Sequence, residues 1–394
     1  MISKINIFWL FGAIILNLSL LIFSLSGLSI SYHEAQIYYS DSNLGAILRY
    51  ISSIFNSNEI ALRTIYLIIH IANSCLIYTI SLKILKRQSD CVIAAILYMF
   101  LPGVLVSALI VNQASIAIFL TLIIILFQQY SKPILMILTL IITLLFSEPF
   151  IALYLAVMLF GIFNRDKKMV VLGAAFCIIW YYLNGFEASG KPKGYFLDSM
   201  AVFAAVFSPL VFIYFIYTLY RIAIKESKGF LWFISITAIG VCMLLSMRQR
   251  VELEIFLPFC VIFVPVMVRT FFSSYRSRLP KFRNIHKFLT IIVLATLAIN
   301  SLVIIFNQYL YIFLDRPSQH FAYKYDIAKD LANKLKSMGI TSISTNQTLS
   351  IRLKIYGITD GGNYYLSQKS QKSCQKIKIS KFDKTIATFY LCEK

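Results

Sequence analysis

Carboxylate and guanidinium side chains stand beside the long apolar runs of this chain, where they could act on a phosphorylated substrate. The carboxylates include Glu34 and Glu148, and the guanidinium groups include Arg63, Arg248 and Arg250. A carboxylate can position or deprotonate an acceptor hydroxyl, and a guanidinium can bind a phosphate through two parallel hydrogen bonds. Together these groups suit a reaction on an anionic, lipid-borne substrate. The alternative, for any single one of these residues, is that it forms an ordinary ion pair at the membrane interface.

The composition indicates that these groups are positioned by membrane-spanning helices. Of the 394 residues, 59% are hydrophobic and 14% are charged, whereas a soluble domain is about half apolar and about a quarter charged. This composition excludes a soluble enzyme. The net charge of +20 would suit a nucleic-acid partner, but Lys and Arg lie in short clusters between apolar runs, which is typical of cytoplasmic loops. We therefore expect a lipid bilayer and no nucleic acid as partner.

The basic clusters and apolar runs predict an all-α polytopic protein of about eleven spans, with a cytoplasmic N-terminus. The predicted cytoplasmic segments hold 17 Lys or Arg and 3 Asp or Glu, whereas the short outside loops hold 6 and 8. We expect a transmembrane domain over residues 1–311, with a first outside loop at 29–60, and a small α/β domain outside the membrane over 312–394. The expected spans are about 5–28, 61–82, 91–107, 114–130, 133–146, 149–163, 169–183, 199–220, 230–247, 255–272 and 288–311.

The tail reads as a small mixed domain. Apolar residues at helical spacing predict a helix over 325–338, and short β-prone runs predict strands at 341–344, 350–356 and 387–391. Cys374 and Cys392 are the two cysteines of the tail, so we expect them to form a disulfide in an oxidising compartment. The scattered His and Cys residues show no metal-ligand spacing.

Several segments resemble motifs of the GT-C glycosyltransferases, meaning the bacterial relatives of protein O-mannosyltransferases and the lipid A aminoarabinose transferase. Tyr32-His33-Glu34-Ala35, with Tyr38 four residues after Glu34, resembles their Asp-Glu-Ala-x-x-Tyr first-loop motif. The segment from Asn58 to Arg63 is similar to the Ser-Glu-x-Ala-Leu-Arg entrance of their second span. Arg248-Gln249-Arg250, followed by Glu254 to Pro258, resembles their late basic motif. The order and spacing of the motifs, over nearly the whole chain, carry the resemblance.

The resemblance implies a GT-C-like fold in a bacterial inner membrane, with the C-terminal domain in the periplasm. It implies transfer of a sugar from a polyprenyl-phosphate donor to a lipid, glycan or protein acceptor, and no cofactor is called for, although a divalent metal is not excluded. Glu34 is the candidate acceptor-side carboxylate, and a helix-capping role is its alternative. Arg63, Arg248 and Arg250 are the candidates for the lipid phosphate, and His33 and Tyr38 are candidate substrate-binding residues.

The chain also departs from the family motifs. His33 stands at the first acidic position, Asn112-Gln113 replaces a usual carboxylate, and Glu148 replaces a usual basic residue. These changes leave open a different acceptor, a rebuilt site that uses Glu148 as a second catalytic carboxylate, or lost catalysis. The competing functions are a ligase or polymerase of lipid-linked polysaccharide, a transporter or flippase of a lipid-linked sugar, and a purely structural role.

Overall fold

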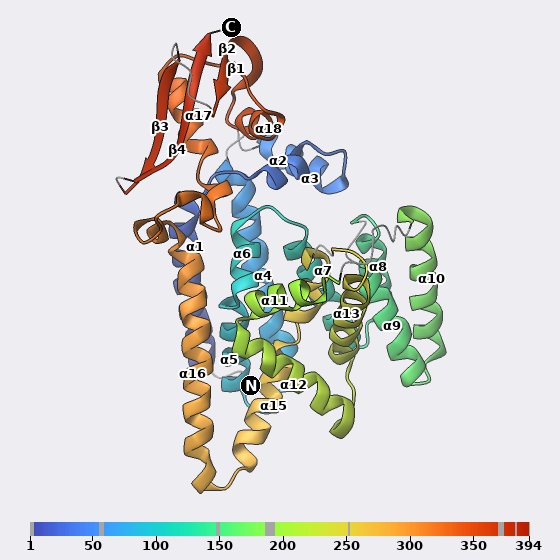
Figure 1. Cartoon of the computed structure of the whole chain (residues 1–394). Helices are drawn as coiled ribbons and strands as arrows, with labels where there is room; N and C mark the ends of the chain where they lie inside the picture. Colours follow the sequence, from blue (N-terminus) through green and yellow to red (C-terminus); the bar gives the residue numbers. More distant parts are fainter. Residues whose placement is uncertain are drawn as a thin grey trace. The chain divides into compact units, whose positions relative to one another are not determined.

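The computed structural model describes residues 4–54, 59–146, 150–185, 194–250, 253–368, 374–382 and 384–393. Most of these residues are helical, and a small sheet forms close to the C-terminus (Figure 1). The α-helices are α1 (Lys4–Ser26), α2 (Tyr32–Tyr39), α3 (Asn43–Ile54), α4 (Glu59–Ile84), α5 (Gln88–Met99), α6 (Pro102–Leu109), α7 (Ala114–Gln129), α8 (Pro133–Thr143), α9 (Ile151–Phe163), α10 (Lys167–Asn184), α11 (Phe196–Phe207), α12 (Pro209–Lys225), α13 (Phe230–Ser246), α14 (Leu257–Val261), α15 (Val264–Ser277), α16 (Pro280–Ile305), α17 (Ala328–Ser337) and α18 (Gln347–Ile355). The 3-10 helices are η1 (Leu253–Ile255), η2 (Asn307–Ile312), η3 (Pro317–Gln319) and η4 (Tyr323–Tyr325), and the strands are β1 (Ser342–Ser344), β2 (Thr359–Ser367), β3 (Gln375–Lys381) and β4 (Lys384–Glu393).

Four to six segments of the described chain are long and apolar enough to cross a membrane. The four are Ile5–Ser26, Ala61–Ile84, Leu257–Ser277 and Pro280–Ile305, and two bent helix pairs raise the number to six. The predicted count of about eleven spans is therefore not confirmed. Each predicted range contains helix, but α7, α8, α9 and α13 have only 10–17 residues, and a perpendicular crossing needs about 20. Hydropathy and charge identify these segments as apolar helices, and the length of each helix then indicates whether it can span the bilayer.

Both bent pairs have a proline at the first residue of their second helix. The break between α5 and α6 turns the chain by 61° before Pro102, and the break between α11 and α12 turns it by 105° before Pro209. Proline has no N–H to donate and disfavours helix at the preceding residue. Ser208, at the sharper bend, adopts a φ of 72°, and Asn300 donates to its hydroxyl at 2.9 Å.

The chain forms two compact units. The first unit comprises Met1–Leu18, Tyr66–Ala108 and Asn112–Ser301, and the second comprises Ser19–Ile65, Leu109–Val111 and Leu302–Lys394. The second unit thus contains both the predicted outside loop and the predicted C-terminal domain. The two units are therefore not divided at residue 311, where the sequence analysis placed the boundary, because the second unit also includes Ser19–Ile65.

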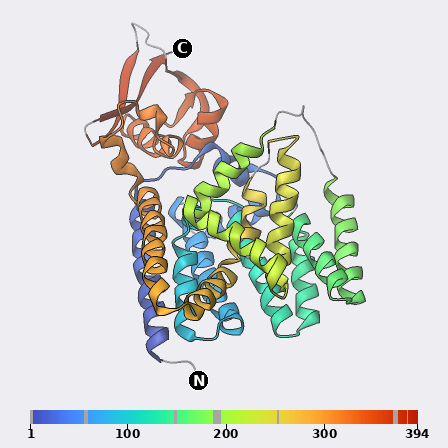
Figure 2. The ribbon, with the colours of Figure 1, turned by 60° about the horizontal axis from the view of Figure 1, so that its bottom comes forward.

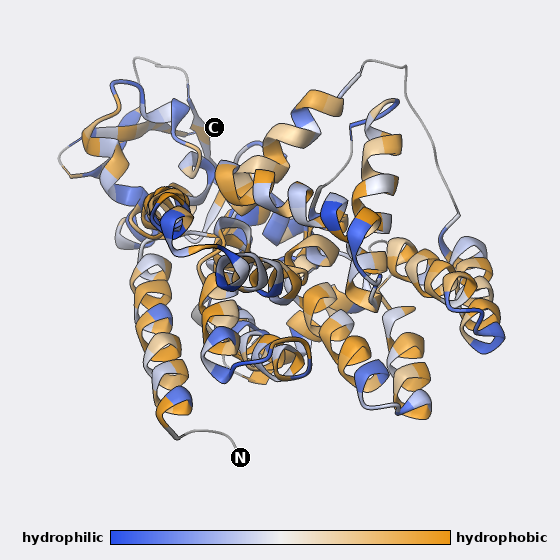
Figure 3. Ribbon diagram, turned by 90° about the horizontal axis from the view of Figure 1, so that it is seen from below, coloured by the Kyte–Doolittle hydropathy of each residue, from blue (hydrophilic) through white to orange (hydrophobic). Residues whose placement is uncertain are grey.

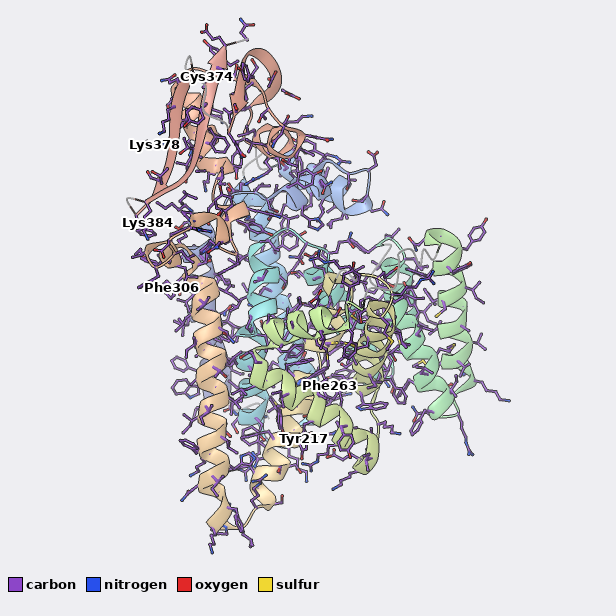
Figure 4. All side chains as sticks on the ribbon, viewed as in Figure 1. Tyr217, Phe263, Phe306, Cys374, Lys378 and Lys384 are labelled. Carbon is purple, nitrogen blue, oxygen red and sulfur yellow. A yellow bond between two sulfur atoms is a disulfide. The ribbon has the colours of Figure 1, made fainter. Side chains whose placement is uncertain are left out.

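The first unit is a helical assembly with an aromatic core. Phe207, Phe215 and Phe263 are fully buried, and the ring centroids of successive pairs lie 4.9 and 5.7 Å apart. Figure 4 labels Phe263 among these helices. Hydrophobic residues cover most of the length of the helices, whereas hydrophilic ones gather at helix ends and in loops (Figure 3). This distribution is typical of helices that pack on one another and also face lipid.

The second unit contains a four-stranded sheet in the order β1-β2-β4-β3. β1 pairs with β2 in parallel, and the other neighbouring pairs are antiparallel. The amphipathic helix α17 packs against the sheet (Figures 1 and 2). Leu331 and Leu335 of α17 are fully buried against Ile377 and Ile379 of β3. The sheet and α17 therefore enclose a core of their own.

The local structure of the tail differs from the sequence prediction at three elements: α18 forms where a strand was predicted, and β2 and β3 form where no strand was predicted. The predicted helix over 325–338 forms as α17, and the strands predicted at 341–344 and 387–391 form within β1 and β4. The strand predicted at 350–356 is wrong, because this segment lies in helix α18. Asn346 caps the helix by accepting the Leu349 N–H at 3.1 Å, and Leu349 and Leu353 bury one helical face. The alternation of apolar and polar residues over 350–356 is typical of a strand, but the buried residues Leu349, Arg352 and Leu353 follow helical spacing.

A disulfide joins Cys374 to Cys392, with the two Cα atoms 4.5 Å apart. We expect reduction, or the Cys374→Ser/Cys392→Ser double substitution, to lower the free energy of unfolding of the second unit by about 3 kcal/mol, since the bond closes a loop of about 19 residues. Thermal unfolding of the full chain with and without reductant measures this. Free thiols on both residues in unreduced native protein would contradict the assignment.

Candidate functional site

Glu34 lies on the short helix α2, and its buried carboxylate accepts hydrogen bonds from two backbone N–H groups. The Ser31 N–H donates to Oε2 at 2.8 Å, and the Ser31 hydroxyl accepts the Glu34 N–H at 3.3 Å, which makes a capping box. The Val111 N–H donates to Oε1 at 2.9 Å. The residue is 2% exposed. The carboxylate therefore fixes the start of α2 and attaches it to the 109–111 segment.

Arg63 supplies the positive charge that compensates Glu34. Its Nη2 lies 3.4 Å from each Glu34 oxygen, and its Nη1 lies 3.0 Å from Oε1 of Glu59, one helical turn earlier on α4. The guanidinium also donates to the carbonyl oxygens of Leu28 and Ser29, at 3.0 and 2.9 Å. At 1% exposure, Arg63 is a buried cross-link between the first loop and α4. We call Glu34, Arg63 and Glu59 the buried triad.

The buried triad continues into the C-terminal part of the same unit. The Tyr356 hydroxyl accepts the Ile30 N–H at 2.9 Å and donates to Oε2 of Glu59 at 2.8 Å. Burial, and secondly the charge of Glu59, raise the pKa of Tyr356 above its ordinary value. The hydroxyl therefore stays protonated and keeps this donated bond. Lys329 adds a second cation, 3.7 Å from Glu59.

Arg352 of α18 completes the attachment of the first loop. Its Nε donates to the Ile30 carbonyl at 2.8 Å, and its Nη2 donates to the Lys324 carbonyl. The side chain is buried, and this burial lowers the pKa of its guanidinium. The backbone N–H and carbonyl of Ile30 thus have partners in Tyr356, which follows α18, and in Arg352 of α18, and unpaired these groups would be costly to bury.

The other face of α2 carries the groups that solvent can reach. His33 is exposed, and Tyr38 is half-buried with its ring packed edge-on against Tyr39 at 5.0 Å. Arg49 of α3 donates to the carbonyls of Tyr38 and Ser40 at 2.7 and 2.6 Å. Lys354 lies over the Tyr39 ring at 4.8 Å, and burial, then Tyr38, raises the pKa of Tyr39 to about 12. α2 is thus held on both ends while His33 stays accessible.

The structure brings together only some of the residues singled out from sequence. Glu34, Arg63, His33 and Tyr38 belong to the second unit, with Glu34 and Arg63 in direct contact. Arg248 and Arg250 belong to the first unit, where both are exposed after the end of α13. Glu148 lies outside the described residues. In the part of the chain that the structure describes, no group of three or more His, Cys, Asp or Glu side chains is placed to hold a metal ion.

The contacts favour different roles for two of the candidates. Glu34 was expected to act on an acceptor hydroxyl, but its buried oxygens are already held by N–H groups and Arg63, which favours the capping alternative. Arg63 was expected to bind a phosphate, but two carboxylates already balance its charge. Sequence reasoning missed Tyr356 and Arg352 as partners. The four-residue spacing of Glu59 and Arg63 was the one visible signal.

No family model matches the chain, and no curated protein is significantly similar to it. The residues of the chain itself are therefore the basis for assigning its function.

Proposed function

We propose that the chain is a GT-C-type membrane glycosyltransferase, which moves a sugar from a polyprenyl-phosphate carrier to a lipid, glycan or protein acceptor. In this proposal the polypeptide crosses a bacterial inner membrane about eleven times, and its second unit faces the periplasm. One observation carries it: the first-loop helix α2 is fixed by the buried triad, while His33 of the same helix remains exposed. The ordered motif resemblance supports it.

The reaction assigns His33 to the acceptor. The acceptor oxygen forms a bond to the anomeric carbon, the bond from that carbon to the phosphate oxygen breaks, and the acceptor proton passes to the His33 imidazole. Polyprenyl phosphate leaves with the bonding electrons. For its phosphate the resemblance implies Arg248 and Arg250, whose guanidinium groups are exposed. Glu34 becomes a positioning residue, because it sets the helix that carries His33.

The proposal is tested with the purified chain in proteoliposomes and a set of radiolabelled polyprenyl-phosphate sugars. Label is expected to move to acceptors in a membrane extract, and the matched Arg248→Ala/Arg250→Ala variant is expected to lose this transfer. Deletion of the gene is expected to accumulate the lipid-linked donor in cells. An unchanged surface glycan, with no accumulated intermediate and no transfer in vitro, would contradict the proposal.

A transporter is the second candidate, and His70 is the observation that favours it. His70 lies ten residues into the candidate span that begins at Ala61 and is 4% exposed. Its Nε2 lies 2.9 Å from the side-chain oxygen of Asn17 on α1. Ionisable residues inside a span mark transport or proton pathways in many membrane proteins. Movement of an intact lipid-linked sugar across the vesicle membrane, without transfer, would select this candidate.

The proposed orientation predicts a labelling pattern. A cysteine at Asp41, in the first loop, is expected to react with an impermeant maleimide in intact spheroplasts. A cysteine at Ser277, at the end of α15, is expected to react only after lysis. Both positions are exposed in the structure, so a difference in labelling reports the side of the membrane. The reverse pattern would contradict the orientation, and the chain with its native cysteines alone is the background control.

A further inference from the structure

A rim of aromatic side chains runs through the second unit from the end of α1 to the β3–β4 turn. The ring centroids of Phe23 and Phe306 lie 5.5 Å apart, those of Phe306 and Tyr309 lie 6.1 Å apart, and those of Tyr309 and Phe382 lie 5.0 Å apart. The rim therefore links helix α1, helix η2 and the β-hairpin through successive ring contacts. Phe306 is labelled in Figure 4, together with Lys384 at the start of β4.

Much of this aromatic rim is exposed, and large apolar residues that follow Tyr309 in the sequence are exposed as well. Phe313 is 82% exposed, Phe382 47% and Tyr309 43%, and Phe321 and Ile312 are exposed too. Single exposed apolar residues are ordinary on a protein surface, but a continuous cluster of large ones marks a surface that is covered in use. The partner that covers this surface must bury several aromatic rings at once.

The position of the rim along the chain identifies the partner. The candidate span Pro280–Ile305 ends one residue before Phe306, and the candidate span Ile5–Ser26 contains Phe23 in its last turn. Tyr and Trp are enriched where spans leave the hydrocarbon and enter the headgroup layer, and segments that lie at the membrane surface bury Phe, Leu and Trp at the same boundary. Two candidate spans thus end at the same rim, which places the rest of its rings at the depth of the lipid headgroups.

The hairpin turn adds a second observation. Phe382 adopts a φ of 47°, in the left-handed region that bulky side chains rarely occupy and that costs about 1 kcal/mol. The turn is held by the lysines on either side: Lys384 donates to the carbonyls of Ile312 and Leu314 at 2.8 and 3.1 Å, and Lys381 donates to the Gly27 carbonyl at 3.0 Å. These contacts fix the hairpin tip beside η2 with the Phe382 ring on the rim.

We infer that this rim is a membrane-contact surface, through which the β3–β4 turn and the 306–321 segment insert their rings into the headgroup layer of the bilayer that α1 and α16 enter. The lipid partner is recognised through its interfacial layer, by burial of the rings. The inference is independent of the enzymatic proposal, since it uses none of the buried triad or His33. A transporter would have the same surface.

Photo-crosslinking of the full chain in vesicles of phosphatidylethanolamine and phosphatidylglycerol tests the inference. Phe313 and Phe382 are each replaced by p-benzoylphenylalanine, which exchanges one ring for a larger one at an exposed position. Met338, 41% exposed at the end of α17, receives the same replacement as a matched control. After irradiation, mass spectrometry is expected to find lipid adducts at positions 313 and 382 in several-fold excess over position 338.

Two outcomes would overturn the inference. Lipid adducts at positions 313 and 382 no more abundant than at position 338 would show that the rings do not meet lipid. Cross-links that join two copies of the chain, in place of lipid adducts, would show that the rim is covered by protein. The intact Cys374–Cys392 disulfide in each variant, read from the same mass spectra, shows that the sheet has formed.

Discussion

Arg63→Met is expected to lower the free energy of unfolding by about 3–5 kcal/mol, the cost typical of removing one partner from a buried ion pair. The substitution leaves Glu34 and Glu59 as two buried carboxylates without their shared cation. It also removes the donors to the Leu28 and Ser29 carbonyls. Thermal unfolding of the purified chain in detergent, followed by intrinsic fluorescence, measures the loss.

Two matched variants show whether the loss comes from the triad. Arg63→Met combined with Glu34→Gln and Glu59→Gln removes all three charges together and is expected to recover part of the stability, because no uncompensated charge stays buried. Arg316→Met removes an exposed cation of the same unit and is expected to change stability by no more than about 0.5 kcal/mol. A melting temperature of Arg63→Met equal to that of the wild-type chain would contradict the structural role of the triad.

His33→Ala is expected to reduce the rate of sugar transfer by about 10²–10⁴-fold, the usual range for loss of a general base, while the melting temperature stays close to wild type. The side chain is exposed, so its removal leaves little packing to lose. Turnover per folded molecule with a saturating polyprenyl-phosphate sugar is the measurement. Wild-type turnover in this variant would exclude His33 as the base.

Glu34→Gln is the matched control, since it changes the next residue of α2 and keeps its shape. Its amide oxygen can still accept the Ser31 or Val111 N–H, but the charge opposite Arg63 is lost. We expect a lower melting temperature and a turnover per folded molecule within a few-fold of wild type. Collapse of turnover at unchanged stability would instead return the catalytic role to Glu34.

Helix α17 and strands β1 and β4 of the tail were predictable, because short-range patterns determine them, whereas α18, β2 and β3 were not. The four-residue spacing of Leu331 and Leu335 identified α17, and both side chains are fully buried in its core. β2 was not predicted, since Gly361 and Gly362 lie in a strand that forms through pairing with β1 and β4. α18 was mistaken for a strand because its buried Arg352 does not look apolar in sequence.

Part of the candidate site was predictable as residues, but the roles of those residues were not. The sequence pointed to Glu34 and Arg63, which do meet. Whether a carboxylate faces a substrate or a guanidinium depends on the donors around it, and those donors come from residues 31, 63 and 111. The predicted span count is not confirmed for a related reason: hydropathy identifies an apolar helix, but only its length indicates whether that helix crosses the membrane.

The bonds of Tyr356 have a consequence for biosynthesis. Ile30 and Glu59 leave the ribosome 326 and 297 residues before the tyrosine that bridges them. At the usual speed of translation this interval lasts on the order of tens of seconds. During that time the first loop lacks the Tyr356 hydroxyl and the Arg352 guanidinium, which bind the backbone of Ile30 in the folded protein. A nascent chain that stops short of Tyr356 therefore lacks the hydroxyl that binds Ile30 and Glu59.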